Sequence, residues 1–139
     1  MKFTLDKKES YTIITVLEDK LDTLNSADFK TELKLLNEGG VSNMVIDLSK
    51  VDFVDSSGLG SILVGNRLCQ GSEGTLVVTG LNANVQKLIS ISRLDGVLTI
   101  TPTAQEAVDI VMMDELMREL AQEEQADEES VLDETLEED

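Results

Sequence analysis

A short polar turn between two apolar segments carries the side chains best suited to chemistry. Asp55-Ser56-Ser57-Gly58-Leu59-Gly60 places a carboxylate and two hydroxyls between an apolar strand-like run and an apolar helix-like run. Three functions fit these residue types: a serine nucleophile, a phosphate-binding loop, and a serine that is itself modified. The rest of the chain bears on the choice among them.

The nucleophile hypothesis lacks a histidine base, and nothing in the sequence places a lysine base near the turn. The chain contains no histidine, which excludes a Ser-His-Asp relay, a Cys-His pair and a histidine metal site. The hydrolase turn Gly-x-Ser-x-Gly needs a glycine two residues before its serine, and Asp55 stands at that position before Ser57. Cys69 is the single cysteine, so a thiolate zinc site is excluded, and its place on an apolar helix face indicates a packed thiol. We therefore expect no enzymatic activity, no metal and no cofactor.

A phosphate-binding loop is also disfavoured. Neither Gly-x-x-x-x-Gly-Lys-Ser/Thr nor Gly-x-Gly-x-x-Gly occurs in the sequence, and Asp55 would repel a bound phosphate. A purely structural interpretation remains open at this point. Aspartate and serine are good helix caps, and glycine tolerates unusual backbone angles, so the turn could be only a helix start.

Composition predicts one small domain. The chain has 139 residues, 41% of them hydrophobic and 3% aromatic, with a net charge of -17. From Asp114 onward it has 13 acidic residues and one basic residue, whereas residues 1–113 have 15 acidic and 10 basic. An acidic chain is a poor partner for nucleic acid.

No apolar run approaches the roughly 20 residues of a membrane span. The start also lacks the apolar centre of a secretory signal, and we expect a cytoplasmic monomer.

The elements that must position the turn follow from hydrophobic periodicity. Two strands at 3–5 and 11–17 form an antiparallel pair, and Asn25 or Ser26 caps a helix that stops at Gly39-Gly40. Later strands are expected at 44–48, 75–79 and 97–101, a second helix between the turn and about residue 71, and a third helix after Asn82. The last helix begins with the capping box Thr103 to Glu106, and its inward residues are expected to be Val108, Val111, Met112 and Leu116.

This order predicts an α/β fold, a mixed β-sheet with helices packed on it in the order β-β-α-β-α-β-α-β-α. The fourth helix should run to about residue 120, so that residues 1–120 form the domain. Residues 121–139 are acidic and poor in apolar side chains, which predicts a disordered tail.

Two stretches of this sequence resemble the STAS domains of bacterial anti-sigma factor antagonists. The run from Ile46 to Gly60, IDLSKVDFVDSSGLG, is similar to the family's signature. Upstream, Leu21 to Ala27 resembles the family's Leu-Asp element before the first helix. The resemblance covers about residues 3–112. It implies the STAS fold and a regulator that acts by binding another protein.

The resemblance further implies a phosphorylation switch. Family members bind an anti-sigma factor that is also an ATP-dependent serine kinase, and thereby release a sigma factor for transcription; phosphorylation by the kinase ends the binding, and a serine phosphatase restores it. Ser57 matches the phosphoacceptor, with Ser56 as the fallback. The implied partner-binding residues are Asp22, Thr23, Asp55, Ser56, Ser57, Gly58, Leu59, Ser61 and Ile62.

Alternatives to these roles stay open on sequence alone. Leu59 and Ile62 are equally explained by core packing, and Asp22 by a helix-entry cap. An alternative function within the fold is a STAS docking subunit of another assembly, such as a lipid-transport or stress-signalling complex, that uses the surface without phosphorylation.

Overall fold

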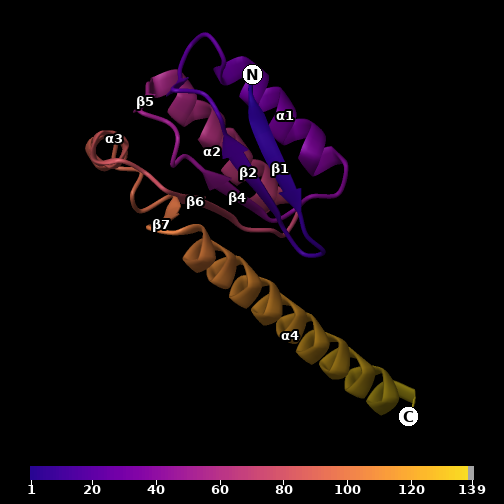
Figure 1. Ribbon diagram of the computed structural model, residues 1–139. Helices are drawn as coiled ribbons and strands as arrows, with labels where there is room; N and C mark the ends of the chain where they lie inside the picture. Colours follow the sequence, from indigo (N-terminus) through magenta and orange to yellow (C-terminus); the bar gives the residue numbers. More distant parts are fainter. Residues whose placement is uncertain (138–139) are drawn as a thin grey trace.

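The protein is a layered α/β structure, seen here in a computed structural model that describes the backbone of residues 1–137 and the side chains of residues 1–128 (Figure 1). Within these residues a five-stranded sheet, a separate two-stranded pair and four helices form. The elements are β1 Phe3–Lys7, β2 Thr12–Val16, β3 Lys20–Leu21, α1 Ser26–Glu38, β4 Met44–Asp47, β5 Phe53–Val54, α2 Ser56–Gly71, β6 Leu76–Thr79, α3 Ala83–Ile91, β7 Thr99–Thr101 and α4 Ala104–Glu137.

The five-stranded sheet is mixed, as the sequence predicts. Its strand order is β1-β2-β4-β6-β7, with β1 antiparallel to β2 and each later neighbour parallel. The predicted hairpin is confirmed by the pairing of Phe3 with Val16. All four residues of β6 are buried, as expected for a central strand of a parallel sheet that helices cover on both faces.

Side chains alternate between the two faces of this sheet and build two apolar layers. Ile46 of β4 and Val78 of β6 belong to the larger layer, which α1, α2 and α3 cover with residues such as Phe29 and Ile62. Their neighbours Val45 and Val77 point to the opposite face. There they pack with Ala107 and Val111 of α4, so the fourth helix alone covers the second face among the described elements.

The buried stripe of α4 differs from the sequence prediction. Val111 is fully buried and Val108 packs at the edge of the layer, but Met112 and Leu116 are 43% and 49% exposed. Successive helical residues are about 100° apart, so a helix that points Val111 at the sheet turns Met112 away from it. The prediction that Met112 and Leu116 point inward is therefore wrong. Ala107, one turn before Val111, packs against the sheet instead.

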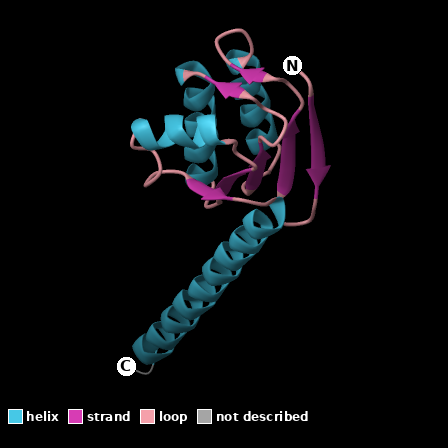
Figure 2. Ribbon diagram, turned by 60° about the vertical axis from the view of Figure 1, so that its left-hand side comes forward, coloured by secondary structure: helices cyan, strands magenta, loops and turns pink. Residues whose placement is uncertain are grey.

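The length of α4 also differs from the expected end near residue 120. The helix continues to Glu137 and projects beyond the sheet (Figures 1 and 2). Its residues after 103 include neither glycine nor proline and are rich in Ala, Gln and Glu, which are strong helix formers. The low hydrophobicity of the residues after 120 is therefore not sufficient to predict that the helix ends there. The assignment of residues 121–139 to a separate tail stays a prediction.

Candidate functional site

Two loops distant in the sequence meet because the short strands β3 and β5 pair in parallel. Leu21 lies opposite Val54, and the backbone amide of Asp55 donates to the carbonyl of Leu21 over 3.2 Å. The chain therefore leaves both strands at the same end, where residues 22–25 face residues 55–57. This pair could not be predicted from the sequence, because two residues are too few to show a period of two.

Asp55 holds the two loops together. One carboxylate oxygen, Oδ1, accepts from the amide of Gly58 at 2.9 Å and caps α2. The other, Oδ2, accepts from both the amide and the hydroxyl of Thr23, each at 3.2 Å. The Gly58 amide, with smaller contributions from Thr23 and Ser57, lowers the pKa of Asp55 below its usual value. The carboxylate is therefore ionised and a weak base at neutral pH.

Ser57 lies beside this carboxylate in the first turn of α2. Its hydroxyl is partly buried and lies 3.4 Å from the hydroxyl of Thr23, whereas Ser56 is exposed. Thr23 is the one side chain within hydrogen-bonding distance of the Ser57 hydroxyl in the part of the chain whose side chains are described. Neither a carboxylate nor an amine contacts that oxygen there. This geometry offers no activation of Ser57 as a nucleophile.

Four of the predicted partner-binding residues are buried under this surface. A Cβ added to Gly58 would lie 2.1 Å from the carbonyl oxygen of Leu21, so glycine is needed where β3 passes over α2. Leu59, Ser61 and Ile62 are also buried, and the Ser61 hydroxyl donates to the carbonyl of Gly58. Their burial gives these four residues a positioning role under the candidate surface. Their direct contact with a partner stays a prediction.

Asp22 shapes the loop before α1. Its side chain accepts from the amide of Leu24 at 3.0 Å, and its carbonyl accepts from the amides of Asn25 and Ser26. Asn25 precedes α1 as predicted, but its side chain does not cap that helix; its amide oxygen accepts from Asp22 N, and its amide nitrogen donates to the carbonyl of Lys20. The loop is therefore ordered by its own short-range hydrogen bonds.

These hydrogen bonds present Leu24 to solvent, and Leu24 is not among the partner-binding residues predicted from the sequence. Leu24 is 92% exposed, the highest value among the exposed large apolar side chains of the described residues. Its signal in the sequence was an apolar residue inside a polar loop. A cavity of about 440 Å³ beside it is lined by four carboxylates and Lys20; the acidic residues are Glu18, Asp19, Asp22 and Asp28. A protein that binds here should offer basic groups and an apolar contact for Leu24.

Other kinds of site have little support in the described residues. No group of three or more histidine, cysteine, aspartate or glutamate side chains that could hold a metal ion occurs there. None of the helices there is long and apolar enough to cross a membrane. Cys69 is buried, as predicted, and its burial raises the thiol pKa to about 12, although the charge of Arg118 acts in the opposite direction.

Comparison with known proteins connects this site to a family. A family model described as "Mlab, STAS domain" matches residues 4–101, which include the β3 to α1 loop, the Asp55 turn and all of α2. Among curated proteins, BtrV of Bordetella bronchiseptica is 30% identical over 104 residues, which cover 75% of this chain and 86% of that protein. BtrV is described as a candidate anti-sigma factor antagonist.

Solved structures share the fold. An anti-sigma factor antagonist from Mycobacterium paratuberculosis superimposes with a TM-score of 0.72 at 20% identity, over 80% of this chain and 93% of that one. The Bacillus cell fate determinant SpoIIAA in its phosphorylated form gives a TM-score of 0.62 at 21% identity, over 79% and 99% of the two chains. At these identities the likeness establishes the fold alone.

Proposed function

The chain belongs to the STAS domain family, and from this we propose that it is an anti-sigma factor antagonist whose binding to an anti-sigma factor is ended by phosphorylation of Ser57. The partner would be an anti-sigma factor that is also an ATP-dependent serine kinase, and a serine phosphatase would reverse the modification. Such a regulator acts in the cytoplasm, where sigma factors are, and it binds neither nucleic acid nor a metal. Its relative BtrV, described as a candidate anti-sigma factor antagonist, supports the coarser part of this proposal.

One observation carries the proposal: Ser57 lies at the junction of the two loops, beside Thr23 and Asp55, in contact with the loop that also presents exposed Leu24. A kinase can reach a partly exposed hydroxyl in the first turn of a helix. A partner that covers the loop at Thr23 and Leu24 would also lie against Ser57, because Thr23 contacts the Ser57 hydroxyl. The same contact surface would therefore be the binding site and the site of its own regulation.

The electrostatics of the junction explain why phosphorylation would release the partner. A phosphate adds about 1.5 to 2 negative charges near neutral pH. It would stand beside Asp55, whose two oxygens already use the Gly58 amide and the Thr23 amide and hydroxyl. The added charge would therefore have few unused donors in this chain. Removing it from water under a partner costs several kcal/mol, and each 1.4 kcal/mol weakens binding about tenfold.

The fold itself should tolerate the modification. Ser57 is on the surface of α2 at the end where the helix dipole favours negative charge, by roughly 0.3 to 1 kcal/mol. Leu59, two residues further along the helix, is the side chain that packs in the core. Release would then follow from charge at the interface and would need no unfolding.

The phosphoacceptor can be mapped directly. The protein is incubated with its candidate kinase, ATP and Mg²⁺, and the modified residue is located by mass spectrometry, with Ser57→Ala as the matched control. We expect one phosphate on Ser57 and none on the control. Phosphate on Ser56 would move the acceptor by one residue, and phosphate outside both serines would refute the assignment.

Release can be tested with two charge variants of the same turn. Ser57→Asp and Ser56→Asp both add one carboxylate in the first turn of α2, but only Ser57 contacts Thr23. We expect both to keep the thermal unfolding profile of the parent protein, and Ser57→Asp to bind the anti-sigma factor at least tenfold more weakly in a calorimetric titration. Equal binding by Ser57→Asp and the parent would contradict the release mechanism.

A docking subunit without a switch is the second candidate. The accessible serines beside Asp55 favour the switch, because docking alone does not need an acceptor hydroxyl. Tight binding to a partner that has no kinase activity, with no phosphate found on either serine, would favour the docking function. A serine hydrolase would instead show reaction of Ser57 with a phosphonate probe, and the lack of a base near its hydroxyl predicts none.

A further inference from the structure

The outer face of α4 presents an apolar stripe that no described element covers. Met113, Met117 and Leu116 are 58%, 59% and 49% exposed, and Met112 and Leu120 lie beside them with 43% and 47% exposed. These five residues, called here the α4 stripe, extend for about 12 Å along the helix. Their spacing of three and four residues places them on one side, opposite buried Val111.

The α4 stripe forms one wall of a groove. The turn between β1 and β2 provides the other wall, and the groove encloses about 660 Å³. Met112, Met113 and Leu116 supply its apolar lining, whereas Glu9, Asp109 and Glu119 supply carboxylates. Further along α4, Glu123 and Glu124 are also exposed. The groove is thus apolar in its middle and negatively charged around its margin.

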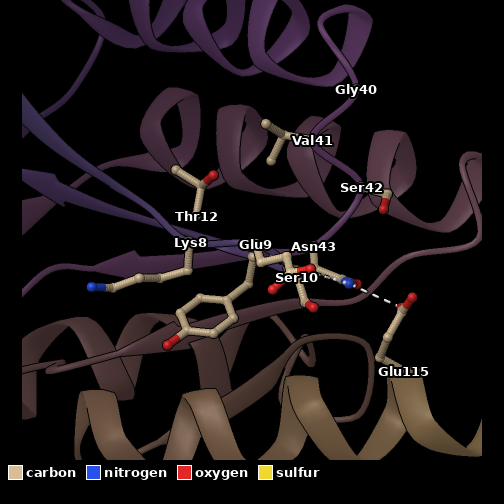
Figure 3. A pocket seen from close by; sticks show the side chains of 10 residues that line it. Lys8, Glu9, Ser10, Thr12, Gly40, Val41, Ser42, Asn43 and Glu115 are labelled. Carbon is tan, nitrogen blue, oxygen red and sulfur yellow. Dashed lines mark hydrogen bonds between the residues drawn. The ribbon is translucent and has the colours of Figure 1, made fainter.

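Polar contacts under the helix hold this groove in place. Glu115 of α4 accepts from the side-chain amide of Asn43 at 3.0 Å, which Figure 3 shows from within the adjoining pocket. Arg118 donates to the hydroxyl of Thr75, and that hydroxyl donates to Asp114 at 3.0 Å. These residues fasten α4 at the amino ends of the central strands, because Asn43 and Thr75 directly precede β4 and β6. The Ser57 junction lies at the opposite, carboxyl end of β4.

We propose that the α4 stripe binds a basic amphipathic helix of a second partner protein. An exposed apolar stripe with an adjoining groove is typical of sites that receive the apolar face of a helix. Methionine suits such a surface because its flexible side chain adapts to different contacts. The carboxylates around the stripe select the partner's charge, since lysine or arginine beside its apolar face would pair with Glu9, Asp109 and Glu119.

A second copy of this chain fits the groove less well. The outer side of α4 carries Asp109, Glu119, Glu123 and Glu124, and Arg118, the one basic residue after position 103, is engaged with Thr75 and Glu115. Two such helices placed face to face would bring like charges together along their whole contact. Anionic membranes and nucleic acid are disfavoured for the same reason.

The proposal is tested with a synthetic 16-residue peptide of leucine and lysine whose leucines recur every three or four residues. The control peptide has the same composition, with its leucines rearranged so that they do not share one helix face. Binding of each fluorescently labelled peptide to the full-length protein is measured by anisotropy. We expect the amphipathic peptide to bind at least tenfold more tightly than the control. Equal binding of the two would show attraction by charge alone and would overturn the proposal.

Two variants locate the binding site. The double variant Met113→Gln with Leu116→Gln should weaken binding of the amphipathic peptide at least tenfold. The control Leu35→Gln, which changes an exposed leucine of α1, should not change binding. Unchanged binding by the double variant would overturn the proposal. If the double variant has lost its folded circular dichroism signal, Met113→Gln alone serves, and it should weaken binding severalfold. Sedimentation that shows a dimer abolished by Leu116→Gln would instead assign the stripe to self-association.

The surface is independent of the function proposed above. Variants of the α4 stripe should leave anti-sigma factor binding unchanged, because the stripe and Ser57 lie at opposite ends of the central strands. Ser57→Asp should likewise leave peptide binding unchanged. The failure of either proposal is therefore distinguishable from the failure of the other.

Discussion

Substituting Gly58 by alanine should test whether the conspicuous glycine of the turn is structural. An added Cβ would lie 2.1 Å from the carbonyl oxygen of Leu21, 2.8 Å from its carbonyl carbon and 3.0 Å from its Cγ. Ordinary contacts of this kind begin at 3.4 Å, and the obstacle is backbone. Either β3 or the start of α2 must therefore retreat by about 1 Å or more.

Gly60 provides a matched control in the same turn of the same helix. A Cβ added there meets nothing within 4 Å. Both substitutions gain helix propensity, by up to about 1 kcal/mol. The difference between the two variants therefore cancels propensity and reports the clash at Gly58. Overpacking of this kind costs about 1–3 kcal/mol, which corresponds to roughly 2–4 °C in Tm for each kcal/mol in a domain near this size.

The assay is urea unfolding of the three proteins, followed by circular dichroism, with anti-sigma factor binding measured in parallel. Gly60→Ala should be as stable as the parent protein or slightly more stable. Gly58→Ala should be less stable than Gly60→Ala by about 1–3 kcal/mol. It should also bind the partner more weakly, because displacing β3 moves Thr23 away from Asp55. Equal stability of the two variants would refute the argument that close packing against Leu21 requires glycine here.

Three further predictions concern single side chains. Asp55→Ala should lower the free energy of unfolding at pH 7 by about 0.5–2 kcal/mol, since it removes the cap of α2. Folding lowers the pKa of Asp55, so the carboxylate stabilises the fold above its unfolded-state pKa, and this stabilisation is lost as the pH falls through its folded-state pKa. The free energies of unfolding of Asp55→Ala and the parent protein, measured with urea, should therefore differ less at pH 3 than at pH 7. Leu24→Ser should leave stability within about 0.5 kcal/mol but weaken anti-sigma factor binding in calorimetry. Cys69 should not react with a thiol reagent at pH 8 until urea unfolds the protein, because burial raises its pKa to about 12.

Each of these three predictions has a contrary result. An Asp55→Ala difference that grows as the pH is lowered would show that the carboxylate is not stabilised as an anion. Unchanged binding by Leu24→Ser would place the partner elsewhere. Rapid labelling of native Cys69 would show that the core around α2 opens without global unfolding.

The sequence was sufficient for the elements with long periodic patterns and insufficient for the shortest ones. β2 and α2 follow from residues whose period repeats several times. β3 and β5 are two residues each and carry no such pattern, yet their pairing brings Thr23 to Asp55. The residue types of the candidate site could therefore be predicted, whereas their contacts depended on a long-range pairing that local sequence does not encode.

The burial of particular residues was harder to predict, because the start of α2 contributes both to the candidate site and to the core. Leu59 belongs to the stretch that resembles the family's signature and Ile62 follows it closely, but both are buried in the core. Periodicity gives the apolar side of a helix but not which part of a wide apolar band faces the sheet. In α4 that band is wide enough to include both Val111 and Leu116, and only packing of Ala107 and Val111 on the sheet settles the orientation.

In the turn around Ser57, some residues fix the geometry of the surface, whereas Ser57 is the residue whose charge could change. Asp55 uses both oxygens to join α2 to the loop that follows β3, and Gly58 lets the strand pass over the helix. Neither residue can change without moving the surface. Ser57 contributes a single long contact to Thr23, at 3.4 Å, so its modification would disturb little of the fold. A charge on Ser57 would therefore act mainly on whatever protein lies against it, which is the property that a reversible binding switch requires.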